Sequence, residues 1–302
     1  MRVSLAGLEL ASPIIAASGT FGYGIEFEDI VSLERIGGFV TKGISLEPIA
    51  GHAAPRLIQT AAGMLNAIGL QNVGVDEFIS RKLPPLKRYP RCNVFVNVFG
   101  YKVGEYVAVI ERLNQAEGIA AYELNVSCPN VLTGGMAFGS DPSELEYLVH
   151  RARAATKRPL IVKLSPNVTS IARMAKIAAD GGADAVSLTN TFLAISIDVE
   201  TRRPRLSNIT GGLSGPAIKP IALRMVYETA KAVSIPILGM GGITTPEDAV
   251  EYLLAGATAV QVGTASYADP RAVARIAKGL ESWCRSHGVE KVASLTGALD
   301  IS

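Results

Sequence analysis

The chain has 302 residues and a mass of 31.7 kDa, a length that suits two ordinary domains or one α/β barrel with insertions. Hydrophobic residues make up 48% and charged residues 19%, which excludes a disordered chain and leaves enough apolar material for a large core. The 29 basic and 27 acidic side chains nearly balance, and no run of five basic residues occurs, so no nucleic acid and no membrane surface is expected as a partner.

Membrane and metal-binding classes are also disfavoured. No stretch of 18 apolar residues is present to span a bilayer, and the apolar segment near the start is too short for a signal peptide, so a cytoplasmic protein is expected. The cysteines Cys92, Cys128 and Cys284 lie far apart without a C-x-x-C pair. This spacing argues against a disulfide framework, a zinc site or an iron–sulfur cluster on this chain. Redox chemistry here would use a bound organic cofactor, and no metal is expected.

Eight short apolar segments of strand length follow one another, each followed by polar or glycine residues and then a helical pattern. They are residues 14–17, 39–42, 94–98, 122–126, 160–164, 185–189, 235–239 and 259–262. Most intervals match one strand–helix unit, and the two longest, after the second and sixth segments, carry insertions. Nearly continuous apolar strands are typical of a parallel sheet that is buried on both faces.

Helices are expected between these strands. Thr245 offers an N-cap before Pro246 at the first helical position, and Gly256 ends that helix. Residues 217–233 carry apolar side chains at helical spacing. Eight such units predict a (β/α)8 barrel, with residues 1–302 as a single domain. An open doubly wound sheet is the alternative, but no G-x-G-x-x-G follows the first strand.

A barrel places its active site at the carboxyl ends of the strands and in the loops that follow them. Glycines after the seventh and eighth strands predict a phosphate site there, because backbone N–H groups can approach an anion closely. Lys42 and Lys163 emerge from apolar strands, where a charge is costly without an anionic partner. A substrate carboxylate and an electron-rich cofactor ring are the expected partners.

Cys128 lies just beyond the fourth strand and opens a loop of about 14 residues that contains Gly134, Gly135 and Gly139. We interpret this loop as a lid, and the thiol as a nucleophile or proton acceptor. The three histidines are expected at the surface. A group of amide side chains suits a neutral ring edge of alternating N–H and C=O groups; these are Asn66, Asn72, Asn97, Asn125 and Asn190.

Six motifs together resemble the dihydroorotate dehydrogenase family. They are residues 41–43 (TKG), 66–72 (NAIGLQN), 97–100 (NVFG), 123–130 (ELNVSCPN), 211–220 (GGLSGPAIKP) and 239–243 (GMGGI). The resemblance covers nearly the whole chain. It implies an FMN-containing barrel that oxidises dihydroorotate to orotate in pyrimidine biosynthesis.

The resemblance also implies roles for residues at matching positions. Cys128 would be the base that removes the C5 proton while the C6 hydride passes to the flavin. The implied substrate-binding residues are Lys42, Asn66, Ala67, Ile68, Gly69, Leu70, Asn125, Asn190 and Thr191. The implied FMN-binding residues are Ser18, Lys42, Gly43, Asn97, Asn125, Lys163, Thr189, Gly215, Gly241, Gly242, Gly263 and Thr264.

Within the family, a cysteine as the base and a first barrel strand close to the start of the sequence resemble the soluble class, class 1. Residues 130–139 (NVLTGGMAFG) and 213–217 (LSGPA) resemble the NAD-linked two-subunit type, class 1B. That type implies a partner subunit that carries FAD and a [2Fe-2S] cluster, in a heterotetramer of two catalytic and two electron-transfer subunits.

Three other functions remain open at this point. One is a fumarate-linked homodimeric dihydroorotate dehydrogenase. Another is a related FMN barrel that reduces uracil rings in free pyrimidines or in transfer RNA, although the lack of basic clusters disfavours the RNA version. The third is a phosphate-binding barrel that only scaffolds a complex.

Overall fold

A closed barrel of eight parallel strands forms the centre of the molecule. This computed structural model describes residues 1–126 and 135–302. The barrel strands are β3 (Ile14–Ala16), β4 (Gly38–Val40), β7 (Val94–Val98), β8 (Ala121–Asn125), β9 (Leu160–Lys163), β10 (Ala185–Leu188), β15 (Ile237–Met240) and β16 (Ala259–Val262). They pair in the order β10-β15-β16-β3-β4-β7-β8-β9, which closes on itself. The eight predicted strands and the predicted (β/α)8 barrel are therefore confirmed.

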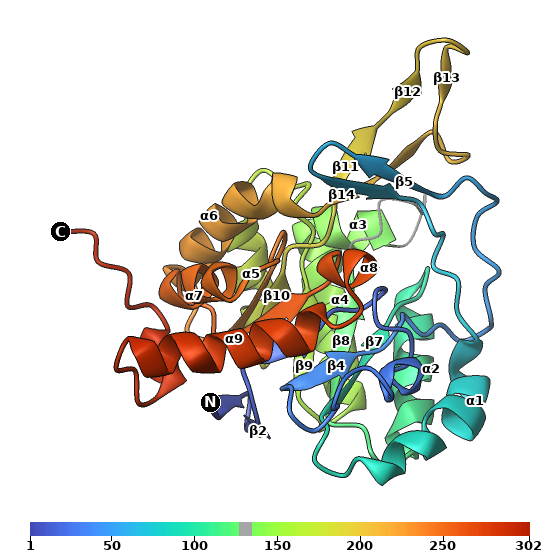
Figure 1. The fold of residues 1–302 in the computed structure, drawn as a ribbon. Coiled ribbons are helices and arrows are strands. Elements are labelled where there is room, and N and C mark those ends of the chain that lie inside the picture. Colours follow the sequence, from blue (N-terminus) through green and yellow to red (C-terminus); the bar gives the residue numbers. More distant parts are fainter. Residues whose placement is uncertain (127–134) are drawn as a thin grey trace.

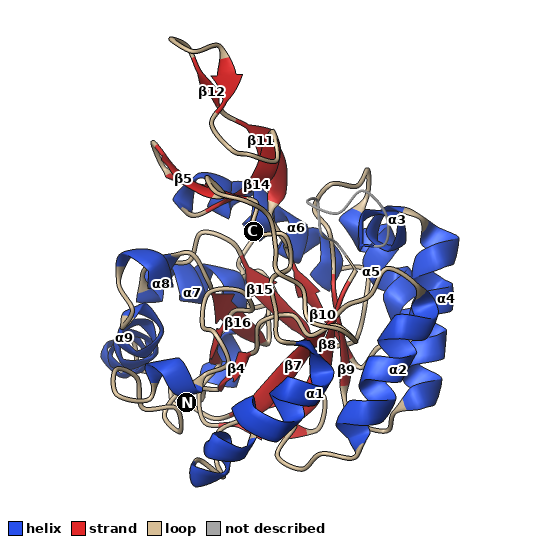
Figure 2. Cartoon of the chain, turned by 90° about the vertical axis from the view of Figure 1, so that its right-hand side faces the viewer, coloured by secondary structure: helices blue, strands red, loops and turns tan. Residues whose placement is uncertain are grey.

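Helices surround the barrel, as Figure 2 shows with helices in blue outside red strands. The longer ones are α2 (Val103–Asn114), α4 (Pro142–Ala155), α5 (Ile171–Asp180), α6 (Lys219–Ala230), α7 (Pro246–Leu254) and α9 (Ala272–Ser286). Short helical segments are η1 (Ile25–Phe27), α1 (Gly74–Glu77), η2 (Phe78–Lys82), η3 (Pro84–Arg88), α3 (Gly135–Ser140), η4 (Pro216–Ile218), α8 (Ala265–Ala268) and η5 (Val292–Leu295).

The two predicted helices form where the sequence places them. Thr245 caps α7 by accepting a hydrogen bond from the Asp248 backbone N–H, and Asp248 reciprocates in a capping box. Gly256, with φ of +115°, follows the helix in a conformation that favours glycine. The second predicted helix, residues 217–233, consists of η4 followed by α6. Its buried face carries Ala222, Met225 and Val226.

The two insertions combine into one additional sheet, which the sequence did not predict. The first insertion supplies β5 (Leu57–Thr60) and β6 (Gly63–Asn66), and the second supplies β11 (Phe192–Ile195) and β14 (Thr210–Ser214). They pair antiparallel in the order β11-β14-β6-β5, with Gly212 opposite Asn66. We call these four strands the mouth sheet. It lies above the barrel in Figure 1, and the hairpin β12 (Ile197–Asp198) and β13 (Arg203–Pro204) extends beyond it.

The remaining segments complete the barrel. A hairpin of β1 (Val3–Leu5) and β2 (Leu8–Leu10) precedes β3 and packs Leu5 and Leu10 into the main core. Within the segment expected to form a 14-residue loop after the fourth strand, Gly135–Ser140 forms helix α3. Cys128 itself, with residues 127–134, lies outside the described part of the chain.

Candidate active site

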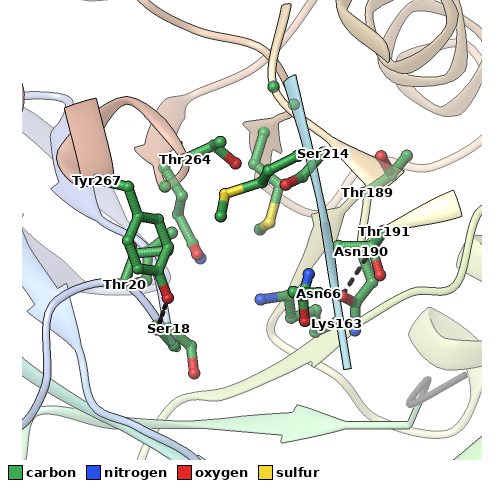
Figure 3. A pocket seen from close by; sticks show the side chains of 18 of the residues that line it. Ser18, Thr20, Asn66, Lys163, Thr189, Asn190, Thr191, Ser214, Thr264 and Tyr267 are labelled. Atoms are coloured by element: carbon green, nitrogen blue, oxygen red, sulfur yellow. Dashed lines mark hydrogen bonds between the residues drawn. The ribbon is translucent and has the colours of Figure 1, made fainter. Parts of the chain in front are cut away.

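A cavity of about 200 Å³ opens at the carboxyl ends of the barrel strands, beside the mouth sheet. Figure 3 shows side chains from many strands converging on this space. It is lined by most of the residues that the sequence assigns to substrate and cofactor: Ser18, Lys42, Gly43, Asn66, Ile68, Leu70, Asn97, Asn125, Lys163, Thr189, Asn190, Thr191, Gly215, Gly241, Gly242, Gly263 and Thr264. The barrel therefore gathers side chains that are up to 246 positions apart, from Ser18 to Thr264.

Three predicted residues do not line the cavity. The Ala67 side chain is fully buried with Leu65 and Leu206 in a small cluster behind the mouth sheet. Gly69 has φ of +75°, and a Cβ there would lie 2.6 Å from the His52 backbone nitrogen. Asn72 uses its amide to hold local backbone, donating to the Leu70 carbonyl and accepting from the Gly74 N–H. These positions shape the loop, and none of the three lines the cavity.

His52 is half-buried rather than a plain surface residue, which corrects the expectation for the histidines. Its Nδ1 lies 3.1 Å from the Ala67 carbonyl oxygen, and its backbone N–H donates to the Ile68 carbonyl at 3.0 Å. The histidine thereby fixes the loop of residues 67–70, whose Leu70 has a φ of +56° that non-glycine residues adopt rarely. His150 and His287 are exposed, as predicted.

Amide side chains form one wall of the cavity. Asn190 donates through Nδ2 to Asn125 Oδ1 at 3.2 Å and accepts from the Thr191 backbone N–H at 2.9 Å. Asn66 donates through Nδ2 to the Gly212 carbonyl at 3.2 Å, which ties it to the neighbouring strand of the mouth sheet. Because Asn66 and Asn190 are both held by hydrogen bonds, the orientation of these amides at the cavity wall is fixed.

Lys42 brings a cation to the same space from the end of β4. Burial disfavours its charged form and nearby Arg56 repels it, so the pKa of Lys42 lies below its ordinary value of 10.5. Arg56 is itself held by a hydrogen bond from Nη2 to Gln71 Oε1 at 2.8 Å. Two cations within Coulomb range of one cavity favour an anionic ligand such as a carboxylate.

The bottom of the cavity holds a buried polar cluster that the sequence interpretation missed. Glu123 is fully buried on β8 and accepts hydrogen bonds from Asn97 Nδ2 at 2.8 Å, Gln261 Nε2 at 2.6 Å and Ser187 Oγ at 2.9 Å. Lys163 Nζ lies 3.8 Å from Glu123 Oε1. We call Asn97, Glu123, Lys163, Ser187 and Gln261 the floor cluster. Lys163, predicted to bind the cofactor, therefore also has a protein carboxylate beside it.

A signal for this cluster was available in the sequence. Glu123 interrupts the apolar strand Ala121–Asn125, and Gln261 interrupts Ala259–Val262. A polar side chain inside an apolar strand is costly to bury unless it is paired. Both residues lie inside their strands, so a prediction based only on strand ends does not include them.

Three polar atoms at the floor lack a partner within the described residues. Five buried side-chain polar atoms are unpaired in this part of the chain, and three of them, Asn97 Oδ1, Thr189 Oγ1 and Gln261 Oε1, belong to residues that line the cavity. Buried polar groups in proteins are almost always hydrogen-bonded, so an orphaned group requires an explanation. Their concentration around one space indicates a site for a polar ligand.

Glycine backbone forms the opposite wall. Gly215 and Gly242 have φ of +97° and +71°, and a Cβ at Gly242 would lie 2.8 Å from the Gly215 carbonyl oxygen. The two loops therefore approach so closely that side chains are excluded. Thr264, which follows Gly263, lines the same wall and is labelled in Figure 3. Gly242 and Gly263 follow the seventh and eighth barrel strands, where the sequence predicts a phosphate site, and Gly215 adds a residue from the second insertion.

Comparison with known proteins identifies the family. A profile described as dihydroorotate dehydrogenase matches residues 1–283. The chain belongs to the dihydroorotate dehydrogenase family. It is thus an oxidoreductase of pyrimidine biosynthesis that oxidises dihydroorotate, as the resemblance implied.

The curated relatives match over nearly their full length. A protein of Pelobacter propionicus is 55% identical over 99% of this chain and 98% of its own, and one of Geobacter sp. (strain M21) is 54% identical over 100% and 98%. Both are named dihydroorotate dehydrogenase B (NAD(+)), catalytic subunit. A protein of Solibacter usitatus, 53% identical over 99% of this chain and 98% of its own, is named putative dihydroorotate dehydrogenase A (fumarate). In the described residues, every helix is too short or too polar to cross a membrane.

Proposed function

We propose that this chain is the catalytic subunit of a two-subunit, NAD-linked dihydroorotate dehydrogenase. It converts (S)-dihydroorotate to orotate on the route to UMP, and it passes the electrons to a partner. The observation that carries the proposal is that one cavity combines a half-buried cation at Lys42, a wall of anchored amides and a floor of unpaired polar atoms. The substrate has the complementary features, a carboxylate and a ring edge of alternating N–H and C=O groups.

The substrate would bind on the mouth-sheet side of the cavity. Lys42 would pair with the substrate carboxylate, since no acidic side chain is paired with it in the described residues. Asn66, Asn125 and Asn190 would bind the amide edges, with Thr191, Ile68 and Leu70 beside them. Asn66 and Thr191 come from different insertions, so the paired mouth sheet brings the substrate residues together.

The residues present also fit FMN. The unpaired atoms of Asn97, Thr189 and Gln261 would meet the polar edge of the flavin ring, with Lys163 beside it, and Ser18, Gly43 and Asn125 would complete the ring site. Gly215, Gly241, Gly242, Gly263 and Thr264 would surround the phosphate. FMN, when bound, supplies the two-electron acceptor for the C6 hydride.

Cys128 is the proposed base for the C5 proton. A thiolate is required for this role, and positive charge on Lys42 and Lys163 would favour one if the thiol reaches the cavity that they line. Cys128→Ala is expected to lower the rate of flavin reduction by dihydroorotate about 10²- to 10⁴-fold at neutral pH. Stopped-flow absorbance of the flavin measures this rate, with Cys284→Ala, far from the cavity, as the control. Full-rate reduction by Cys128→Ala would contradict the assignment.

The proposed partner carries FAD and a [2Fe-2S] cluster, in a heterotetramer of two catalytic and two electron-transfer subunits. A fumarate-linked homodimer is the second candidate, because a relative as similar as 53% carries that name. The chain alone, and then with any co-purified protein, should be assayed with fumarate, a quinone and NAD. NAD reduction only in the complex is expected, whereas fumarate turnover by the isolated chain would favour the second candidate.

A further inference from the structure

The floor cluster contains a buried carboxylate that neither the proposed substrate site nor the proposed base uses. Glu123 is 0% exposed, and its two oxygens face only donors: Asn97 and Lys163 at Oε1, Ser187 and Gln261 at Oε2. An ionised carboxylate accepts at both oxygens, which suits this arrangement. Interiors of such barrels are filled mainly by branched aliphatic side chains, so packing alone does not call for this group.

The carboxylate fixes which way two amides face. Asn97 and Gln261 each donate a hydrogen bond from the side-chain NH₂ group to Glu123. The reverse orientation would place an amide carbonyl oxygen against a carboxylate oxygen, and the two would repel. Their own carbonyl oxygens are consequently directed elsewhere, and both are buried without a partner in the described residues. Asn97 Oδ1 lies beside Gly43, where a Cβ would be 3.0 Å away, and Gly43 lines the cavity.

We propose that Glu123 is a positioning residue that fixes the hydrogen-bonding pattern of the cavity floor. It turns the oxygens of Asn97 and Gln261 toward the ligand as acceptors and holds Lys163 beside them as a donor. Two acceptor oxygens and one donor suit a ring edge that carries an N–H between carbonyl groups. The N–H would donate to an amide oxygen, and a carbonyl would accept from Lys163. The pyrimidine edge of a flavin has these groups. The inference rests on the proposed binding of FMN.

The negative charge has a further effect on the bound flavin. Reduced flavin carries negative charge on its pyrimidine ring. The Glu123 carboxylate would be separated from that ring by the side chains of Asn97 and Gln261, and its negative charge would disfavour the reduced form. Lys163 offsets part of this repulsion. Removing the charge of Glu123 while keeping its shape should therefore weaken oxidised FMN binding more than reduced FMN binding, and should raise the midpoint potential.

The test compares the wild-type holoenzyme with Glu123→Gln. The glutamine NH₂ faces the NH₂ of Asn97 or Gln261, so one amide must turn over. The dissociation constant of oxidised FMN, measured by flavin fluorescence, is expected to rise about tenfold or more. If oxidised FMN loses tenfold more affinity than reduced FMN, the potential of the two-electron couple rises by about 30 mV. The visible absorption spectrum of bound FMN should also change.

Tyr122→Phe is the matched control on the same strand. The Tyr122 hydroxyl donates to Asn114 and accepts from Arg158 on the outer side of the barrel. Its loss should lower thermal stability and leave FMN affinity and potential unchanged. If Glu123→Gln behaves like Tyr122→Phe, Glu123 is only structural and the proposal is overturned.

A second variant covers the case in which Glu123→Gln does not fold. Glu123→Asp keeps the charge but withdraws the carboxylate by one methylene from both amides. Weaker FMN binding at an unchanged potential is expected, and wild-type affinity would overturn the proposal. Failure of the wild-type protein to bind FMN would instead contradict the proposed function, and with it this inference.

Discussion

The floor cluster and the mouth sheet border the same cavity but are built in opposite ways. Floor residues lie on central strands of a closed barrel and are at most 7% exposed. The mouth sheet is open, with β5 and β11 as its edge strands, and carries exposed apolar side chains such as Leu57 at 40%, Leu193 at 47% and Ile195 at 52%. A closed barrel leaves no unpaired edge, whereas a small open sheet with few buried contacts opens locally at low cost.

This difference suits the two proposed ligands. A cofactor that stays bound requires a preorganised and dry floor, and the floor cluster supplies hydrogen bonds that are already made. A substrate that enters and leaves each cycle requires a wall that can adjust, and the mouth sheet provides Asn66 on such a wall. We expect substitutions at the floor to change stability and cofactor binding, and those at the mouth to change substrate affinity first.

The largest expected effect is at the floor. Lys163→Met leaves the buried Glu123 carboxylate without its cation. This should lower the free energy of unfolding by ~3 kcal/mol. The value is at the low end for a broken buried ion pair because three hydrogen bonds to Glu123 remain. Urea denaturation of the apoprotein measures it. Lys176→Met, at the exposed pair with Asp180, is the control and should change stability by less than ~0.5 kcal/mol. If Lys163→Met and Lys176→Met lower the free energy of unfolding equally, the buried ion pair of the floor cluster contributes no more to stability than an exposed pair.

An intermediate effect is expected where the two insertions meet. A Cβ at Gly212 would lie 2.0 Å from Thr191 Oγ1, so Gly212→Ala must displace Thr191. Overpacking of this kind costs ~1 to 3 kcal/mol. Because the mouth sheet can adjust, we expect a raised KM for dihydroorotate with little change in FMN affinity.

Gly104→Ala is the matched control for that substitution. Gly104 is the exposed second residue of α2 and has open space where a Cβ would lie, so alanine should change the free energy of unfolding by less than ~0.5 kcal/mol. Steady-state kinetics and fluorescence titration separate substrate from cofactor effects. A loss of FMN binding in Gly212→Ala would show that floor and mouth are not independent.

The smallest effect concerns pH. Burial and Arg56 lower the pKa of Lys42, so its charged form is lost at a lower pH than in an ordinary lysine. Binding of a carboxylate to Lys42 is full below this pKa and weakens as pH rises through it. We therefore expect KM for dihydroorotate to rise on the alkaline side.

Arg56→Gln should move this alkaline limb to higher pH, because removal of a neighbouring positive charge raises the pKa of Lys42. The pH dependence of KM, measured in both proteins, tests the shift. If the alkaline rise in KM moves to lower pH in Arg56→Gln, the assignment of Lys42 as the partner of the substrate carboxylate is contradicted. The midpoint potential of the flavin should be the same in both, since Arg56 lies outside the floor cluster.

Several features of the site could be predicted from sequence because they depend on local order. Strand ends in a barrel converge on one face, so a residue such as Asn125 or Gly242 could be assigned to the cavity from its position after an apolar segment. The loop of residues 66–72 shows the limit of this reasoning. Asn66 reaches the cavity, whereas the side chains of Ala67 and Asn72 turn away, since side-chain direction in an irregular loop depends on backbone angles and on His52.

The sequence by itself determined the barrel, the order of its strands and the family, since apolar periodicity and contiguous motifs are local properties of the chain. The tertiary structure alone decided that the two insertions pair, because β6 and β14 are about 150 residues apart and their register depends on the closed barrel beneath them. It also decided the partners of Glu123. Those partners come from four other strands, and only barrel closure brings Asn97, Lys163, Ser187 and Gln261 around one carboxylate.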